Sequence, residues 1–329
     1  MAAGAAMLVA TLAVPAWAAD NAQAGKTLAQ QIFDAMVQEQ GVQPGHRIAH
    51  AKGIVVEGTF VPSPAAARLS RAAHLQGGPV PVTVRFSDGP GNLGVADNAP
   101  DAGPRGMGIR FTLPGGGLTD IEGVSHNGFA VGTGEDFLAL QKAVVATDPS
   151  RPHPWPVEEF LTTHPRALKF VQETAAAPAS FATEAYFSNN AYVFVNKDGL
   201  KQAVRYQMLP AAGIRRLSEA EAKGRSPDFL RDEIRARLAK GPVEFRLVAQ
   251  LPNAGDPTND ASLAWPDDRR TVDLGTIRIV SVAADSATAE KALVFFPTAI
   301  TDGIELSDDP LVQLRTSVYA LSFARRQQP

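Results

Sequence analysis

The sequence predicts an α+β or barrel architecture for its 329 residues. Strand-like runs, rich in β-branched and aromatic residues, come in separate groups that glycine and proline divide. Helical segments accompany these groups, but strands and helices do not alternate one by one. Because a doubly wound parallel sheet requires that alternation, this fold class is excluded. Neither a repeat nor a low-complexity segment interrupts residues 27–329.

The first 18 residues, MAAGAAMLVATLAVPAWA, have the pattern of a secretory signal. They are apolar with many small residues, and they end in Ala16-Trp17-Ala18, which predicts cleavage after Ala18. The apolar run is too short for a membrane span, and no later run reaches spanning length. We therefore expect a flexible leader over 19–26 and a single domain over 27–329, exported to the periplasm and without a membrane span.

Apolar side chains at helical spacing predict a helix over 27–40, which glycine and proline end. Three strand-like runs follow, with the sequences GIVVEGTF, PVTVRFS and GMGIRFTL. Between the last two lies GPGNLGVADNAPDAGPRG, a long segment rich in turn residues. A loop of this length without structure of its own is uncommon and often functional.

The second half continues with a predicted helix over 136–146 and proline-divided helical pieces over 150–180. Strands are predicted at AYVFVN and QAVRYQML, joined by a turn at Lys197-Asp198-Gly199. One or two amphipathic helices over 217–240 precede the strands VEFRLVAQL and TVDLGTIRIVSV. A last helix over 310–325 begins at Asp309-Pro310, because proline is favoured in a first helical turn.

Composition excludes several classes of protein. The chain has no cysteine, so disulfides, thiolate-ligated haem and iron–sulfur clusters are excluded. Its net charge is −3, without a basic excess or an acidic block. A nucleic-acid-binding surface is therefore not expected.

Arg315 and Tyr319, in the segment LRTSVY, would lie one turn apart on the same face of the last helix. A neighbouring guanidinium lowers the pKa of a phenol, which ordinarily lies near ~10. A phenolate formed in this way is a suitable ligand for ferric iron. The alternative is an amphipathic helix with Tyr319 in the core and Arg315 in water.

Three further segments contain candidate site residues. HRIAHAKG provides His50, which could move a proton, and Arg47, which could bind a carboxylate. VRFS ends in Ser87, and GPRGMG places Arg105 between glycines that allow close approach of a ligand. Each residue also has an ordinary interpretation: a satisfied histidine, a turn serine, and an arginine in solvent.

The order RxxHAKG, VRFS, PRGxxxxF and RxxxY resembles the haem catalase family. Two longer stretches, LVAQLPNAGDPTNDASLAWPDDRRTVDLGTI and DGIELSDDPLVQLRTSVY, resemble it as well. The resemblance extends from about residue 28 to 325 and implies an antiparallel β-barrel core with surrounding helices. Because the chain is short for this family, it resembles the small exported catalase-related peroxidases, without the N-terminal arm and the C-terminal helical domain.

On one side of the cofactor, the resemblance implies His50 as the acid–base histidine and Ser87 as the residue that orients it. An asparagine completes this side in catalases. Counted without a gap, its place falls on Val124 or Ser125. A shift of two or three residues gives Asn127, for which a turn residue before a glycine is the alternative.

For the other side, the resemblance implies haem b with Tyr319 as its axial iron ligand and Arg315 as the charge partner of the tyrosine. Arg47 and Arg105 are implied to hold the haem propionates.

The implied function is reduction of hydrogen peroxide or an organic peroxide with a small organic electron donor, accompanied by weak catalase activity. The segments that guard the haem channel in long catalases are expected to be missing. The arm that interlocks their tetramers is expected to be missing as well, which predicts a monomer or dimer.

Two alternative functions remain. One is a haem enzyme that rearranges fatty-acid hydroperoxides. The other is a non-catalytic haem- or lipid-binding barrel, which would need no oriented proton shuttle.

Overall fold

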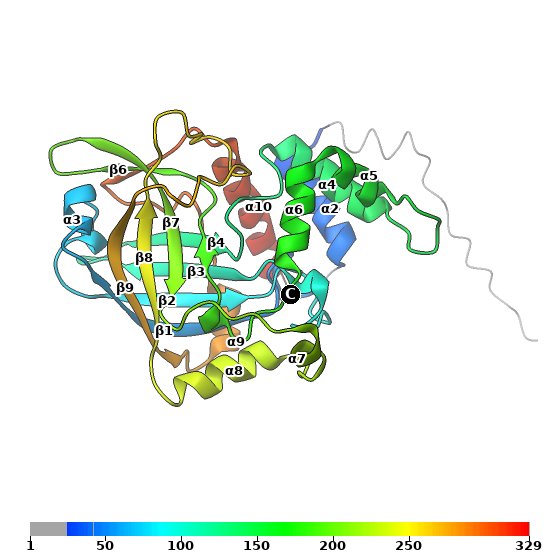
Figure 1. The fold of residues 1–329 in the computed structure, drawn as a ribbon, viewed down its shortest axis with the longest axis horizontal. Helices are drawn as coiled ribbons and strands as arrows, with labels where there is room; N and C mark the ends of the chain where they lie inside the picture. The colour runs from blue at the N-terminus through cyan, green and yellow to red at the C-terminus, as the bar shows by residue number, and fades with distance from the viewer. Residues whose placement is uncertain (1–24, 42, 329) are drawn as a thin grey trace, which may run out of the picture.

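The computed structural model describes residues 25–41 and 43–328. The predicted signal over 1–18 and most of the leader over 19–26 lie outside these residues. A β-barrel forms one side of the molecule and a group of helices the other, with helix α10 between them (Figure 1). The predicted α+β class is therefore confirmed, and the barrel is its core.

The barrel is antiparallel and closed. Within the described residues, neighbouring strands pair in the order β5, β4, β3, β2, β1, β9, β8, and β7 joins β8 to β5. Closure between β7 and β8 extends from Arg205 opposite Gln250 to Pro210 opposite Phe245. The eight strands are β1 (Gly53–Pro62), β2 (Val80–Ser87), β3 (Gly106–Thr112), β4 (Leu118–Val124), β5 (Tyr186–Phe187), β7 (Lys201–Pro210), β8 (Val243–Gln250) and β9 (Thr271–Val282).

Two short strands extend the sheet beside β7. These are β6 (Tyr192–Val195), which forms a hairpin with β7 through the predicted turn, and β10 (Ile304–Leu306), which pairs with β6. The sequence analysis did not predict β4, β5 or β10. β4 has the sequence LTDIEGV, in which two acidic residues obscure the apolar alternation that marks a strand.

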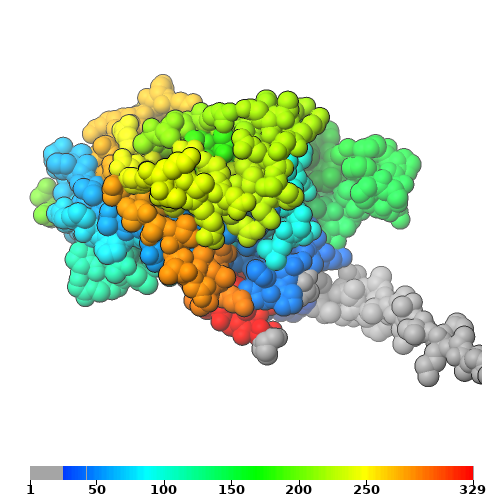
Figure 2. Space-filling model, turned by 90° about the horizontal axis from the view of Figure 1, so that it is seen from below, coloured from blue at the N-terminus to red at the C-terminus, as the bar shows by residue number. Residues whose placement is uncertain are grey.

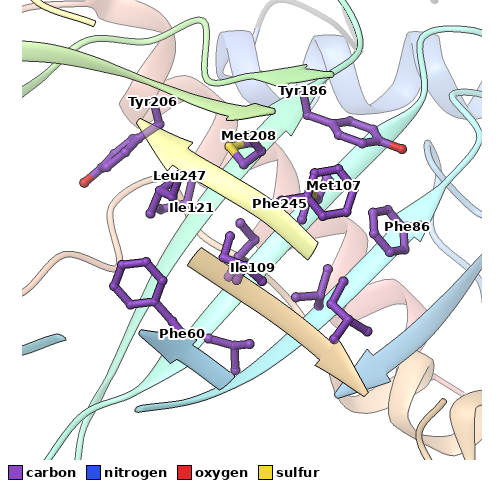
Figure 3. Close-up of a cluster of buried hydrophobic side chains, with 14 of the residues drawn as sticks. Phe60, Phe86, Met107, Ile109, Ile121, Tyr186, Tyr206, Met208, Phe245 and Leu247 are labelled. Atoms are coloured by element: carbon purple, nitrogen blue, oxygen red, sulfur yellow. The ribbon is translucent and has the colours of Figure 1, made fainter. Parts of the chain in front are cut away.

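The barrel interior is packed with aromatic and aliphatic side chains, and Figure 3 shows its centre. The Phe86 ring lies 5.4 Å from that of Phe181 and 5.9 Å from that of Phe245, measured between centroids. Side chains alternate across a strand, so β2 directs Val84 and Phe86 inward. Its polar neighbours Arg85 and Ser87 therefore face outward, where they are still buried by the helices.

The helices cover the outside of the barrel. α2 packs on α4 and α10 through a small apolar cluster, and the side chain of Thr27 caps its start in a reciprocal bond pair with Gln30. Seen from below, α7 and α8 form the yellow-green surface beside the orange α9 (Figure 2). The helices are α2 (Leu28–Gln40), α3 (Ala66–Leu69), α4 (Gly134–Ala146), α5 (Pro156–Thr163), α6 (Pro165–Thr174), α7 (Glu219–Lys223), α8 (Phe229–Leu238), α9 (Ser286–Ala292) and α10 (Pro310–Arg326).

Most predicted elements are found within a few residues of their expected bounds, including the helix over 27–40 and the last helix. The sequence analysis missed α9, a helix of 7 residues with the polar sequence SATAEKA. Among the described residues, no helix is both long enough and apolar enough to cross a bilayer.

His74 is a polar exception at the edge of the barrel core. Its ring lies 4.7 Å from that of Phe111 and 6.3 Å from that of Phe60, and neither ring nitrogen has a hydrogen-bond partner. Burial lowers the pKa of His74 to about 3. In the unfolded chain the imidazole binds a proton near its ordinary pKa of ~6.5, so this residue destabilises the fold progressively as pH falls below that value.

We therefore expect His74→Leu to reduce the acid sensitivity of the fold. The free energy of unfolding of the parent should fall between pH 7 and pH 5 by about 2 kcal/mol more than that of the variant. Denaturant titrations at both pH values measure this difference. His153→Leu is the control, because the His153 side chain is largely exposed. An equal loss in parent and His74→Leu would contradict the expectation.

Candidate functional site

A cavity of about 470 Å³ lies between the outer face of β2, β3 and β4 and the helices α2, α4, α5, α6 and α10. Both His50 and Tyr319 line it, although 269 positions separate them in the sequence. Most of the lining side chains are apolar. The long segment between β2 and β3 also contributes to the wall, through Gly89, Pro90 and Pro104. The cavity therefore brings together the two residues that the sequence analysis placed at opposite sides of a cofactor.

His50 is held in a defined tautomer. Its Nδ1 lies 2.9 Å from the backbone oxygen of Asp88 and 3.1 Å from Oγ of Ser87. A carbonyl oxygen only accepts hydrogen bonds, so Nδ1 carries the proton and Nε2 keeps a free lone pair. Burial, and then the positive charge of Arg85, lower the pKa of His50 to about 4. The imidazole is therefore neutral at pH 7 and able to accept a proton.

The backbone of His50 is also held by hydrogen bonds, in addition to its side chain. Its φ of 55° lies in the left-handed region, which is uncommon for a residue other than glycine. The strain is offset by two bonds: the His50 N–H donates to the oxygen of Gly89 at 2.7 Å, and Arg85 Nη2 donates to the His50 oxygen at 2.8 Å. Gly106 leaves the space that the ring occupies, because a Cβ there would lie 2.9 Å from its Nδ1.

Tyr319 and Arg315 lie one turn apart on α10, as their spacing predicts. Arg315 donates to the Tyr319 hydroxyl from Nη2 at 3.1 Å and from Nε at 3.3 Å, and both residues line the cavity. The alternative with Arg315 in bulk water is therefore wrong. Burial raises the pKa of Tyr319, while Arg315 opposes this shift with a smaller effect. A bound cation would thus be needed, in addition to Arg315, to keep this phenol ionised at neutral pH.

Three arginines gather at another part of the wall around a single carboxylate. Arg85 Nη2 lies 2.9 Å from Oε2 of Glu290, and Arg47 Nη1 lies 3.9 Å from the same oxygen. Arg326 Nη2 donates to the oxygen of Leu293 at 2.9 Å. Burial and the positive charge of Arg85 lower the pKa of both Arg47 and Arg326. Three guanidinium groups against one carboxylate leave two positive charges in excess, which suits a ligand that carries two carboxylates.

Two predicted site residues do not reach this cavity. Arg105 is buried elsewhere: its Nε lies 3.2 Å from Oδ1 of Asp88, and its Nη2 donates to the oxygen of Asp97 at 2.6 Å. Its assignment to the propionates was therefore wrong. Asn127, which follows the end of β4, does not line the cavity either, whereas the ungapped alternative Val124 does.

The sequence analysis missed Arg85, Arg326 and Glu290. Arg85 stands within the quoted segment VRFS, two residues before Ser87, and alternation along a strand could have placed both on one face. Arg326 follows Tyr319 by seven residues, or about two helical turns, which is again the same face. Glu290 had no comparable signal, because only the tertiary fold brings α9 to these arginines.

The residues present fit a haem. In the described part of the chain, no group of three or more histidine, aspartate or glutamate side chains could hold a bare metal ion. An iron bound by Tyr319 would therefore need its remaining ligands from a macrocycle, which the apolar walls could contain. The two excess positive charges match two propionates.

A tyrosine paired with an arginine and a neutral histidine, both lining one largely apolar cavity beside a closed barrel, form the arrangement of a haem-dependent oxidoreductase. A family model described as Catalase matches residues 19–327, and the chain belongs to the catalase family. It is accordingly an enzyme that acts on peroxide.

Curated relatives include short proteins of the same family. The catalase-related peroxidase of Mycolicibacterium paratuberculosis is 40% identical over 299 residues, which cover 90% of this chain and 94% of the relative. A catalase-related peroxidase of Synechococcus elongatus is 31% identical, over 90% of this chain and 88% of its own. Both are therefore matched over nearly their whole length.

Solved structures agree on the fold. A bacterial catalase superposes with a TM-score of 0.75 at 22% identity, and a fungal catalase with 0.77 at 22%. The match covers 86% and 91% of this chain, but only 57% and 63% of the two catalases.

We predict that Gly106→Ala disturbs catalysis without unfolding the protein. The added methyl would lie 2.7 Å from Ser87 Oγ and 2.9 Å from His50 Nδ1, so the imidazole must move. A displacement of about 1 Å can cost about 100-fold in rate, and we expect peroxide turnover to fall by about 10- to 100-fold.

Gly78→Ala is the matched control, because no atom lies within 4 Å of its added Cβ. Circular dichroism should be unchanged in both variants. Full activity of Gly106→Ala would show that the geometry of His50 and Ser87 is not limiting.

Proposed function

We propose that this chain binds haem b, with Tyr319 as the axial ligand of the iron, and reduces peroxides with a small organic electron donor. The observation that carries the proposal is the neutral imidazole of His50, oriented by the oxygen of Asp88 and by Ser87, in the same cavity as the Arg315–Tyr319 pair. A protein that only stores haem would need no such base.

When bound, haem supplies the iron that breaks the O–O bond. The residues of this chain act around it. Nε2 of His50 takes the proton of the peroxide and returns it to the departing oxygen, so that water leaves. Arg47, Arg85 and Arg326 hold the propionates through the excess positive charge of their cluster.

Peroxidase activity is favoured over catalase activity by the wall beside His50. Val124, an apolar residue, lines the cavity where an asparagine was expected from the resemblance. Two other amides of the lining are bound within the protein: the oxygen of Asn189 accepts from the Gly128 N–H, and Asn190 donates to Asp309 and accepts from Arg315. A second peroxide beside His50 therefore has fewer hydrogen-bond donors available than it would have if an asparagine stood in place of Val124. The names of the two curated relatives point in the same direction.

We therefore predict that oxidation of a dye donor by the haem-loaded protein is faster than release of oxygen from hydrogen peroxide. Both rates are measured on the same preparation, one by dye absorbance and the other with an oxygen electrode. Rapid oxygen evolution with negligible dye oxidation would reverse the proposed order of the two activities.

The pH dependence of dye oxidation should reflect the protonation of His50. Its pKa is lowered to about 4, and only the neutral imidazole accepts a proton. Dye oxidation should therefore stay constant as pH falls through ~6.5 and decline only near the lowered pKa. Stopped-flow rates between pH 8 and pH 4, with stability of the protein checked at each pH, test this expectation.

A His50→Ala variant should lose about 100- to 10,000-fold in rate, the usual contribution of a general acid–base group. An undiminished rate in this variant would leave only the haem-binding interpretation.

A further inference from the structure

Glu122 is an acidic residue of the cavity wall that the proposed reaction does not yet use. It lies on β4, on the same outward face as Val124, and its side chain lines the cavity. Its Oε2 lies 2.9 Å from Nη2 of Arg315. Its other oxygen, Oε1, is buried and has no hydrogen-bond partner.

The guanidinium of Arg315 is shared among three acceptors. It donates to the Tyr319 hydroxyl, to Oε2 of Glu122 and to the side-chain oxygen of Asn190. Two of these acceptors are acidic groups, whereas the guanidinium carries a single positive charge. A carboxylate in direct contact offsets much of that charge, and the effect is strong because the site excludes bulk water. Tyr319 therefore receives less than the full electrostatic effect of its arginine.

The contact between Glu122 and Arg315 is fixed by its surroundings. Asn190 is anchored by Asp309, whose Oδ2 accepts from Nδ2 of Asn190 at 2.8 Å. The other arginine nearby, Arg110, is already paired with both oxygens of Asp120, at 2.8 and 2.7 Å. Arg315 is thus the cation that holds Glu122.

A role limited to joining β4 to α10 would not require an acid here. A buried ion pair is weak evidence for stability, because desolvation offsets the attraction. The unpartnered Oε1 adds a further desolvation cost, which an apolar side chain would avoid. A carboxylate that shares the guanidinium bound to Tyr319, and whose other oxygen is unpaired, points instead to an effect on that tyrosine.

We propose that Glu122 is a positioning residue that acts on the iron through Arg315. By taking part of the guanidinium charge, it leaves the oxygen of Tyr319 richer in electrons, which stabilises ferric over ferrous iron. This inference rests on the proposed ligation of haem by Tyr319.

The test compares the reduction potentials of the haem-loaded parent, Glu122→Gln and Glu39→Gln. Glutamine keeps the shape and the acceptor oxygen but removes the charge. Glu39 is the control, because it also lines the cavity, from α2, without a hydrogen bond or ion pair to Arg315. Potentials are measured by spectroelectrochemistry at pH 8.5, above the pKa of about 7 to which burial raises Glu122.

We expect Glu122→Gln to shift the ferric–ferrous equilibrium about tenfold toward ferrous, which is about 59 mV for one electron. Glu39→Gln should shift it less than twofold. An unchanged potential in Glu122→Gln overturns the inference, even if the variant is less stable, and so does an equal shift in the control.

The absorption spectrum of the parent separates this inference from the proposed function. Without the absorption of a phenolate-ligated ferric haem, the proposed function fails and the inference fails with it. With that absorption present, an unchanged potential in the variant overturns the inference alone.

If Glu122→Gln does not take up haem, Glu122→Asp keeps the charge but withdraws it from Arg315. A smaller shift in the same direction is expected, and no shift overturns the inference.

Discussion

The geometry of the cavity depends on the hydrogen bonds and the ion pair of the Arg85 guanidinium. It donates to the backbone oxygens of His50 and Ala51 at 2.8 and 3.2 Å and pairs with Glu290 at 2.9 Å. One buried charge thus joins the segment of His50, the strand β2 and the helix α9. The same charge contributes to the low pKa of His50 and of Arg47. One guanidinium therefore influences both the protonation of His50 and the charge of the neighbouring arginine.

The barrel strands have two functions because their side chains alternate. On β2, Phe86 packs into the core while its neighbours Arg85 and Ser87 face the cavity. On β4, Ile121 points inward and Glu122 points outward. Polar residues of the site are thus attached directly to a closely packed framework. The core limits how far they can move, which supports the orientation that proton transfer requires.

Local spacing explains which parts of the site could be predicted from the sequence. Arg315 and Tyr319 needed only a helix, and His50 with Ser87 followed from motifs in a known order. Arg105 was assigned to the propionates from the resemblance alone, whereas in the structure its side chain pairs with Asp88. Asn127 required a shift of two or three residues, and the structure places the unshifted position, Val124, in the cavity instead. Glu122 and Glu290 meet their arginines only through tertiary contacts, for which one sequence provides no signal.

Helix α10 carries both Tyr319 and Arg326, so it sets the distance and the angle between the two residues that we propose to hold the haem. At a rise of about 1.5 Å per residue, seven positions separate the proposed iron ligand Tyr319 from Arg326, which we propose to hold a propionate, by about 10 Å along the helix axis. A deletion of one residue between them would rotate Arg326 by about 100° relative to Tyr319 and break the match. This stretch of the chain should therefore tolerate exchanges of side chain far better than changes of length, the opposite of what holds for the exposed turn between β6 and β7.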